Sequence, residues 1–332
     1  MDNRVDDVVV STRIRFARNV KDLPFPKRLS GQEEIYSVLM KGVKEACDGL
    51  FKSRFYKMCD IDSLLAQSYV EKHLISNDLV KNVNFGALVV SEDEDVAVMI
   101  NEEDHIREQC VVEGFDLDGA YRKLVKVDEA IAAKLNIAFD PKLGYLTACP
   151  TNLGAAMRAS VMVFLPALTL TKKINSLIND LQRLDFTTRG VYGEGSGAQG
   201  FMYQISNQAT VGKSEEDIIN LVKKTVSRII EIERKERENL KKTHGVELQD
   251  KIMRAFGILT NCYLIDSAEF SELLGYVKLG VALGYVSRDM AKINKLLTLS
   301  QPAMLCMLAA KVLQPRDRDK ARAALGRKFL QQ

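Results

Sequence analysis

Five arginines lie close to the predicted ends of strands, helices or loops: Arg13, Arg15, Arg107, Arg158 and Arg189. A guanidinium group keeps its charge at any relevant pH and binds phosphate oxygens through two parallel N–H groups. Several converging arginines could therefore hold a triphosphate without the GxxxxGK(S/T) loop. The sequence lacks that loop, and it also lacks the HRD and DFG motifs of protein kinases. The alternative is that these are ordinary surface arginines.

Two segments rich in carboxylates add a second kind of chemistry. The run NEEDH (101–105) ends an apolar stretch, and Glu194 lies in the glycine-rich stretch GVYGEGSG. Carboxylates on two separate loops could clamp a cationic substrate, and glycines let the backbone approach it closely. The alternatives are a solvated acidic turn and a plain flexible loop. A metal site within 101–105 is disfavoured, because adjacent residues on a strand point to opposite faces.

Cys149 precedes Pro150 and the segment TNLG, which is predicted to open a helix. A thiol near a helix N-terminus and cationic side chains has a lowered pKa, whereas a buried cysteine is inert, and both interpretations remain open. The six cysteines include no CxxC pair, which argues against a zinc ribbon and a disulfide scaffold. No apolar run reaches the roughly 18–20 residues that a membrane span needs, and no signal-peptide core is present. These features predict a soluble, reduced, cytoplasmic protein.

The overall charge excludes some partners. Lys and Arg number 47 against 44 Asp and Glu, so the formal net charge is only +3. A chain this close to neutral has no global field that demands a nucleic acid or a membrane surface. The tail from Lys311 to Lys328 is locally basic but lacks interleaved aromatic residues, so we expect no direct nucleic-acid binding.

These residues need strands and helices to position them. Short apolar runs predict strands at residues 5–10, 85–90, 96–100, 144–149 and 201–208, and one more leading into the glycine-rich loop within 186–200. Helical spacing predicts helices at residues 31–48, 60–75, 116–135, 155–183 (interrupted near Pro166) and 215–242. If the first strand continues through STRIR, Arg13 and Arg15 point to one face.

The length of 332 residues favours two domains. The run EIERKERENLKK is nearly all charged and is predicted to end the first domain. From residue 247 onward the sequence has helical periodicity and no convincing strand. We therefore predict an α+β, catalytic-looking domain over residues 1–243 and an all-helical domain over 244–332.

Four motifs stand in one order and spacing: STRIRFARN, VMINEEDHIR, CPTNLG with MRASV, and RGVYGEGS. Together they resemble the phosphagen (guanidino) kinases, which include creatine and arginine kinases, from about residue 8 to residue 240. The resemblance implies an antiparallel sheet flanked by helices and an ATP-dependent transfer to a guanidino group. Within this family the chain is most similar to the bacterial protein arginine kinases. Three features point there: STRIR begins at residue 11 without a preceding helical domain, VEKHLIS and RASVM match, and RDKARA (318–323) fits an RDxxRA motif.

The resemblance assigns nucleotide binding to residues of these motifs: Ser11, Thr12, Arg13, Ile14, Arg15, His73, Arg107, Arg158, Ala159, Ser160, Val161, Met162, Arg189, Gly190, Val191, Tyr192, Gly193 and Glu194. It makes Glu103 the carboxylate that holds and deprotonates the substrate guanidinium, and Glu194 the carboxylate that orients it. It places Cys149 beside the substrate. It also implies an allosteric phosphoarginine pocket, to which it assigns Arg318, Asp319 and Arg322.

The resemblance implies ATP and Mg²⁺, with the metal held by the nucleotide and not by a protein site. Implied partners are protein substrates with exposed arginines, a zinc-containing activator, a heat-shock repressor, a Clp unfoldase-protease and a second copy in a homodimer. The implied role is to mark proteins for degradation in the stress response. The alternatives are a kinase for small guanidino compounds and a non-catalytic phosphoarginine-binding adaptor. One departure concerns GAAMR (154–158), where the family usually has GTGLR; it is expected to weaken nucleotide binding but not to abolish activity.

Overall fold

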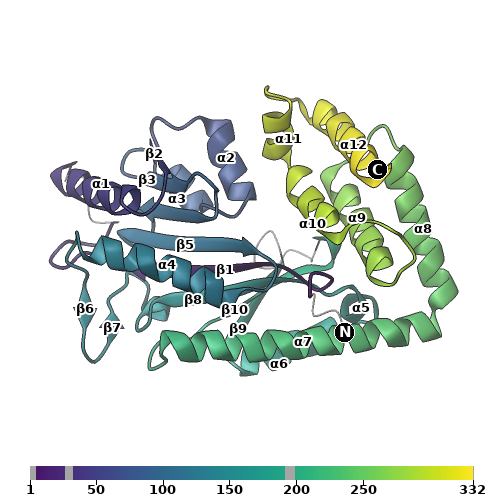
Figure 1. Ribbon diagram of the computed structural model, residues 1–332, viewed down its shortest axis with the longest axis horizontal. Helices are drawn as coiled ribbons and strands as arrows, with labels where there is room; N and C mark the ends of the chain where they lie inside the picture. Colours follow the sequence, from purple (N-terminus) through teal and green to yellow (C-terminus); the bar gives the residue numbers. More distant parts are fainter. Residues whose placement is uncertain (1–4, 27–32, 191–198, 332) are drawn as a thin grey trace. The chain divides into compact units, whose positions relative to one another are not determined.

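The computed structural model describes residues 5–26, 33–190 and 199–331 (Figure 1). The chain forms two compact units. Unit 1 comprises residues 1–11, 161–205 and 224–332, and unit 2 comprises residues 12–160 and 206–223. No helix in the described ranges is long and apolar enough to cross a membrane.

An eight-stranded sheet is the main feature of the fold. Its strands follow the order β2 (Ser53–Lys57), β3 (Ala87–Ser91), β4 (Val96–Ile100), β5 (Ile106–Glu113), β1 (Val9–Arg18), β8 (Met157–Phe164), β10 (Met202–Asn207) and β9 (Phe186–Gly190). The strands from β2 to β5 pair antiparallel, with Ala87 opposite Ile100 and Val96 opposite Cys110. The predicted hairpin at 85–100 and the predicted strand at 201–208 are confirmed. The prediction missed β2 and β5.

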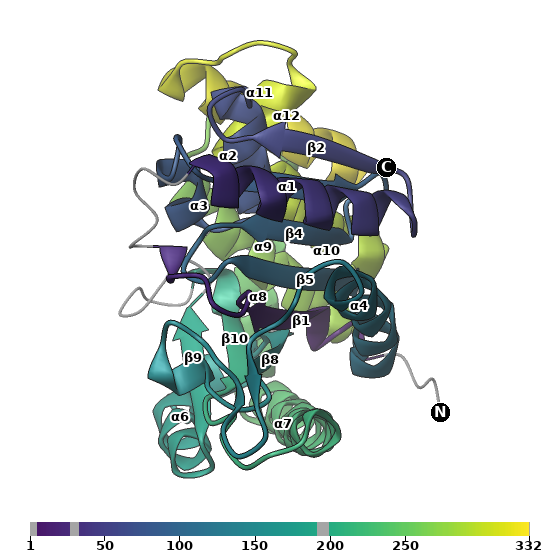
Figure 2. The same cartoon turned by 90° about the vertical axis from the view of Figure 1, so that its left-hand side faces the viewer.

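Helices cover both faces of the unit 2 part of this sheet (Figure 2). On one face, α2 (Ser63–Glu71) and α3 (Asn77–Lys81) pack against Leu88, Val90, Ala97 and Met99. On the other, α1 (Glu33–Asp48) packs on β3 and β4, and α4 (Leu117–Ala132) packs on β5. Strands buried on both faces read as continuous apolar runs, which explains FGALVV and VAVMI.

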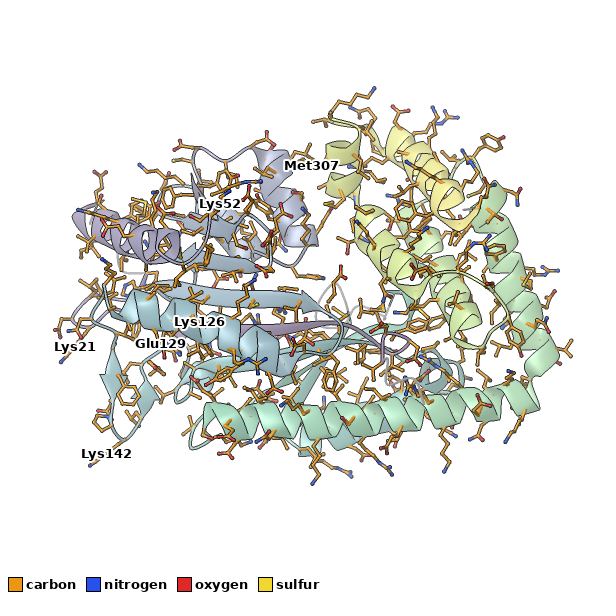
Figure 3. The ribbon with its side chains drawn as sticks, in the orientation of Figure 1. Lys21, Lys52, Lys126, Glu129, Lys142 and Met307 are labelled. Atoms are coloured by element: carbon orange, nitrogen blue, oxygen red, sulfur yellow. The ribbon has the colours of Figure 1, made fainter. Side chains whose placement is uncertain are left out.

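The helix α4 shows how the pattern positions an element. Its buried stripe comprises Leu117, Ala120, Leu124, Val127 and Ile131, at helical spacing. The N-cap Asp116 accepts a hydrogen bond from the Gly119 N–H at 2.8 Å. Lys126 and Glu129 lie on the solvent side of the helix (Figure 3). The predicted helix at 116–135 is therefore confirmed.

Two predictions of secondary structure are wrong. The segment 155–183 is not helical throughout: it forms β8, and helices α5 (Pro166–Leu170) and α6 (Ile174–Arg183) begin only at Pro166. Every residue of β8 except Arg158 is buried, or nearly so, and an apolar run with no alternation is easily taken for a buried helix. Of the predicted strand at 144–149, only Gly144–Tyr145 (β7) pairs, and it pairs with Phe139–Asp140 (β6).

Unit 1 contains the helical C-terminal part. The helix α7 (Glu215–Thr243) runs from unit 2 into unit 1 and is followed by α8 (Gly245–Asn261), α9 (Ser267–Ala282), α10 (Met290–Leu299), α11 (Pro302–Leu308) and α12 (Pro315–Gln331). An apolar core joins α8, α9, α10 and α12 around the fully buried Phe270. The predicted helical character of 247–332 is confirmed, with no strand in its described residues.

Candidate active site

Four of the five predicted arginines converge in unit 2. Arg13 and Arg15 lie on β1, Arg107 lies on β5 and Arg158 on β8, and β1 is the strand between the other two. Burial and the charges of Arg13, Arg107 and Arg158 lower the pKa of the Arg15 guanidinium well below its usual value. Only guanidinium groups that lie close together repel one another in this way. We refer to these four side chains as the arginine cluster.

The register of β1 and β8 explains the convergence. The Ala17 N–H donates to the Ala156 carbonyl at 3.0 Å, and Ser160 contacts both the Nε and the carbonyl of Arg13. These two points define an antiparallel register in which Arg15 lies opposite Arg158. Arg13 and Arg15 share a face, as predicted, while Ile14 is buried on the other side. Arg158 was predicted to open a helix, and it lies instead on a strand.

Serine hydroxyls accept hydrogen bonds from two arginines of the cluster, and a carboxylate accepts from a third. The Arg158 Nε and Nη2 donate to Ser206 Oγ at 3.1 and 3.0 Å, and Arg13 Nε donates to Ser160 Oγ at 3.4 Å. Arg107 Nη1 donates to Glu102 Oε1 and Oε2 at 2.7 and 2.8 Å.

Within this cluster, three of the four charged groups that act on Arg15 are arginines, and they disfavour its positive charge. Glu102 is the carboxylate whose charge offsets part of the repulsion on Arg15. In addition, the buried Arg15 Nε has no hydrogen-bond partner within the described residues. A buried donor without an acceptor costs free energy, which the oxygen of a bound anion would recover. The geometry is that of a site for an anion with several negative charges.

His73 lies against this cluster in a left-handed conformation, with φ of 59°. Its carbonyl accepts a hydrogen bond from Gln109 Nε2 at 2.8 Å. Burial, together with the charges of Arg13 and Arg15, lowers the pKa of the His73 imidazole to about 4. The imidazole is therefore neutral at pH 7 and adds no further positive charge to the cluster.

The low pKa of His73 predicts a loss of stability in acid. Between pH 6.5 and about 4 the His73 imidazole is protonated in the unfolded chain but not in the folded protein. The free energy of unfolding therefore falls as the pH falls. The loss reaches at most about 3 kcal/mol, since each unit of pKa difference is worth about 1.4 kcal/mol. Urea unfolding of the protein and of His73→Gln, measured at pH 7.0 and pH 4.5, checks this. The free energy of unfolding of the parent should fall more between pH 7.0 and pH 4.5 than that of His73→Gln. An equal fall in both proteins would contradict the prediction.

The turn between β4 and β5 separates its three acidic side chains. The Asn101 N–H donates to the His105 carbonyl at 2.9 Å, which closes the turn, and Asn101 has a φ of 57°. Glu102 turns inward, where Ser76 Oγ donates to it at 2.6 Å, and Asp104 is also buried. Glu103 is exposed at the tip. Across the described ranges no group of three or more His, Cys, Asp or Glu side chains is arranged to hold a metal ion.

Asp104 joins this turn to the segment that carries Cys149. Its Oδ1 accepts hydrogen bonds from Asn19 Nδ2 at 2.6 Å and from the Ala148 N–H at 2.7 Å. The partly exposed Cys149 follows, with its Sγ 3.0 Å from Thr151 Oγ1, and a short 3-10 helix begins at Pro150. Asp104 is the neighbour of Glu103, and Ala148 is the neighbour of Cys149. Their hydrogen bond therefore holds the two segments together.

The other residues predicted to bind the nucleotide differ in their burial and in the unit to which they belong. Thr12, Ile14, Ala159 and Val161 are fully buried, backbone included, so they support the neighbouring arginines and do not face a ligand. Ser11, Met162, Arg189 and Gly190 belong to unit 1. Four predicted residues lie outside the described residues: Val191, Tyr192, Gly193 and Glu194.

The departure GAAMR places an alanine in a strained conformation. Ala156 is buried and has a φ of 48°, a region that costs an L-residue about 1–2 kcal/mol and glycine much less. Gly154, with a φ of 107°, lies against the Thr210 carbonyl and leaves no space for a side chain.

Ala156→Gly is therefore expected to stabilise the protein by about 1 kcal/mol and to raise its Tm by a few degrees. The free energy of unfolding from urea titration measures the effect. Ala155→Gly is the matched control, because Ala155 does not have a positive φ and gains nothing from glycine. Equal effects in the two variants would show that Ala156 stores no strain.

In unit 1, the RDxxRA motif lies on α12, where its residues have unequal environments. Arg322 is buried and donates to the carbonyls of Ser300 and Ile265, both at 3.0 Å, and to Asp319 Oδ1 at 2.7 Å. Arg318 and Asp319 are partly exposed. The guanidinium of Arg322 is thus used to tie α12 to two neighbouring segments.

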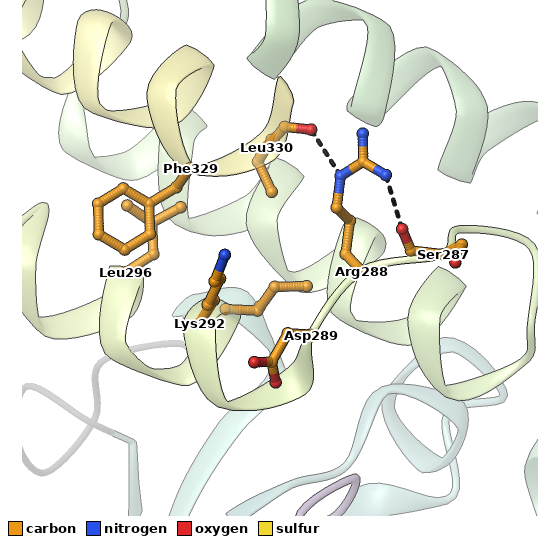
Figure 4. A pocket seen from close by; sticks show the side chains of 8 residues that line it. Ser287, Arg288, Asp289, Lys292, Leu296, Phe329 and Leu330 are labelled. Carbon is orange, nitrogen blue, oxygen red and sulfur yellow. Dashed lines mark hydrogen bonds between the residues drawn. The ribbon is translucent and has the colours of Figure 1, made fainter. Parts of the chain in front are cut away.

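A cavity of about 270 Å³ lies between the start of α10 and the end of α12 (Figure 4). Leu296 and Phe329 form apolar walls, and Arg288 and Lys292 line it with positive charge. Arg288 is partly engaged, because its Nε donates to the Leu330 carbonyl at 2.7 Å. None of these residues belongs to a motif from which a function was predicted.

Comparison with known proteins decides the family. The family model "ATP:guanido phosphotransferase, C-terminal catalytic domain" matches residues 34–236, and "Protein-arginine kinase McsB C-terminal domain" matches residues 245–332. The protein-arginine kinase of Geobacillus stearothermophilus is 45% identical over 328 residues, which are 98% of this chain and 90% of the relative. The chain belongs to the protein-arginine kinases. That of Bacillus subtilis (strain 168) is 43% identical over 98% of this chain and 90% of its own length.

Solved structures place this protein-arginine kinase among the phosphagen kinases by fold. The duplicated taurocyamine kinase from Schistosoma mansoni with bound transition state analog components is 28% identical, with a TM-score of 0.61 over 68% of this chain and 33% of its own. Lombricine kinase is 25% identical, with a TM-score of 0.60 over 69% of this chain and 67% of its own. The predicted α+β fold of a phosphagen kinase is therefore confirmed, and the predicted family with it.

The other positions that hold the arginine cluster of this protein-arginine kinase were not predicted as holders. Glu102 stands next to the predicted Glu103, and Ser206 and Asn207 lie in a stretch predicted only as a strand. No pattern in the sequence marks Ser206. It lies on β10, which is separated from β1 only by β8. That place becomes visible once β8 is recognised as a strand.

Proposed function

We propose that this protein transfers the γ-phosphoryl group of ATP to arginine side chains of other proteins. The observation that carries the proposal is the arginine cluster on β1, β5 and β8, beside the turn that exposes Glu103. A cluster of guanidinium groups suits the polyphosphate of ATP, and a carboxylate suits a guanidinium substrate. Family membership makes the phosphotransferase activity the expected one.

In this proposal the arginine cluster binds and neutralises the phosphates. Arg13, Arg15 and Arg158 donate to phosphate oxygens, while Arg107 is already paired with Glu102 and supports the edge of the site. Fixed positive groups stabilise the charge that spreads over the transferring phosphoryl group. Mg²⁺ arriving with ATP would supply further neutralisation of the same oxygens. The resemblance assigns a further role in nucleotide binding to Arg189 and to residues 190–194.

Glu103 is proposed to act as the general base that removes a proton from the substrate guanidinium. A guanidinium has a pKa above about 12 and no free lone pair, so it must lose a proton as it attacks. The substrate nitrogen forms a bond to the γ-phosphorus, the bond from that phosphorus to the ADP oxygen breaks, and the proton passes to Glu103. An exposed turn gives Glu103 access to an arginine on a large protein. Glu194 would orient the guanidinium plane, and Cys149 would lie beside it.

We also propose the division of labour that the sequence suggests. Residues 1–243 would carry the catalysis, and residues 244–332 would carry an allosteric phosphoarginine pocket. Arg318 and Asp319 would contact the ligand, and Arg322 would support them from the interior. The proposed setting is the cytoplasm, with a homodimer, a zinc-containing activator, a heat-shock repressor as substrate, and a Clp unfoldase-protease that reads the mark.

The test is incubation of the purified protein with Mg-ATP and casein, a disordered protein with exposed arginines. Mass spectra are recorded without acid, because the P–N bond is acid-labile. We expect phosphoryl groups on arginine, and none with Glu103→Gln. Transfer to free arginine but not to casein would support a small-molecule kinase instead. Binding of phosphoarginine without any transfer would support an adaptor.

A further inference from the structure

The short helix α3 binds the β4–β5 turn through the residues at both of its ends, all within unit 2. Its N-cap Ser76 donates through Oγ to Glu102 Oε1 at 2.6 Å. Its C-cap Asn82 donates through Nδ2 to the Asn101 carbonyl at 2.6 Å. Ser76 Oγ also accepts from the Leu79 N–H at 3.1 Å, so one hydroxyl both caps the helix and holds the turn.

The helix is itself fixed to the core of unit 2. Leu79 is fully buried and belongs to the apolar cluster that contains Leu88 of β3 and Met99 of β4. Beyond the helix, the Phe85 carbonyl accepts a hydrogen bond from Asn101 Nδ2 at 3.1 Å. A helix of five residues anchored in this way has little freedom to move, so its two ends are fixed points for the turn.

The carboxylate that Ser76 holds also fixes the backbone of Glu103. Glu102 Oε2 accepts a hydrogen bond from the Glu103 N–H at 3.0 Å, and the same carboxylate pairs with Arg107. Burial raises the pKa of Glu102, but the charge of Arg107 and the hydrogen bonds outweigh burial and bring this pKa below its ordinary value. Glu102 is therefore ionised at pH 7, and its donors set its position. The chain of contacts runs from α3 through Glu102 to Glu103.

We propose that Ser76 and Asn82 are positioning residues for phosphoryl transfer, which hold from the two ends of α3 the turn that presents Glu103 to the substrate guanidinium. The inference rests on the proposed function, because it takes Glu103 as the base. It goes further by assigning to the reaction two residues outside the predicted site. A base must lie within hydrogen-bond reach of the proton that it removes, and a misplacement of about 1 Å can lower a rate by about 10²-fold.

The test removes one hold at a time. Ser76→Ala and Asn82→Ala should each lower kcat for transfer to casein about 10-fold, roughly the effect of losing one well-placed hydrogen bond. The Kd for ADP, measured by calorimetry, should change by less than about twofold, because Arg13, Arg15 and Arg158 keep their places. Ser76→Thr keeps the hydroxyl and should restore most of kcat. Asn82→Ala leaves the N-cap in place, so it decides the question even where Ser76→Ala fails to fold.

A matched control separates the hold from the cap. Asp62 caps the neighbouring helix α2, where its side chain accepts a hydrogen bond from the Leu65 N–H at 3.0 Å. Asp62→Ala should lower the Tm by a few degrees, as Ser76→Ala does, and leave kcat unchanged. A fall in kcat as large as that of Ser76→Ala would show that any lost cap slows the reaction, which would overturn the inference.

A double variant tests whether the hold acts through the base. In the Glu103→Gln background, Ser76→Ala should have little further effect on kcat. The inference is overturned if Ser76→Ala lowers kcat equally in both backgrounds, if Ser76→Thr is as slow as Ser76→Ala, or if Asn82→Ala has the parental kcat. Parental transfer by Glu103→Gln alone would reject the proposed base. A loss in Glu103→Gln with parental kcat in both α3 variants would reject the hold and leave the base.

Discussion

Replacing Glu103 with glutamine should slow phosphoryl transfer by about 10²- to 10⁴-fold, the range that a general base contributes, and leave the affinity for ATP nearly unchanged. Glutamine has the size of glutamate and can still accept a hydrogen bond, but it cannot take a proton from the substrate guanidinium. Glu103 is exposed at the tip of the β4–β5 turn, so its replacement leaves the core intact.

Glu102→Gln is the matched control for this variant, because the two residues are adjacent and chemically identical. Glu102 holds Arg107 and accepts a hydrogen bond from Ser76, so its loss should weaken nucleotide binding and lower stability. Single-turnover transfer to casein measures the chemical step, and ADP calorimetry measures binding. If both variants lose binding and transfer to the same extent, Glu103 is a structural residue of the turn and not the base.

Replacing Arg15 with methionine should have two opposite effects. Nucleotide-dependent transfer should fall at least about 10²-fold, as is usual when a group that stabilises the transition state is removed. The protein without nucleotide should become more stable, because burial and three neighbouring arginines disfavour the charged guanidinium of Arg15. Methionine keeps much of the length of the side chain and has no charge to desolvate.

Thermal unfolding with and without Mg-ADP checks both effects in one experiment. The parent should gain a few degrees on addition of saturating Mg-ADP, since a ligand at 100 times its Kd adds about 2.7 kcal/mol. Arg15→Met should start from a higher Tm and gain much less. Arg122→Met, on the exposed side of α4, is the control for loss of one positive charge. A lower starting Tm for Arg15→Met would show that Arg15 stabilises the fold, contrary to its environment.

Much of the fold follows from local patterns, and the exception has a physical cause. The hairpin at 85–100 and the helix α4 were predictable because turn residues and helical spacing mark them. The strand β8 was not, because it is buried on both faces and therefore lacks the alternation that identifies a strand. Arg158 was predicted as a site residue, but on the wrong kind of element.

The site could be predicted only where residue type announces chemistry. Arginines and carboxylates in ordered motifs pointed to Arg15 and Glu103. Ser206 and Asn207 could not be found in this way, because serine and asparagine are common and their roles arise from the pairing of β8 with β10. Glu102 and Glu103 have identical side chains, and only the geometry of the turn distinguishes them.

The environment of Arg322 bears on how the RDxxRA motif is inherited. Its guanidinium ties α12 to the carbonyls of Ser300 and Ile265, so a relative without the proposed response to phosphoarginine would still be selected to keep this arginine. The last arginine of the motif is therefore a poor marker of regulation across genomes. In the proposed phosphoarginine pocket, the partly exposed Arg318 and Asp319 are the positions expected to change when ligand binding is lost.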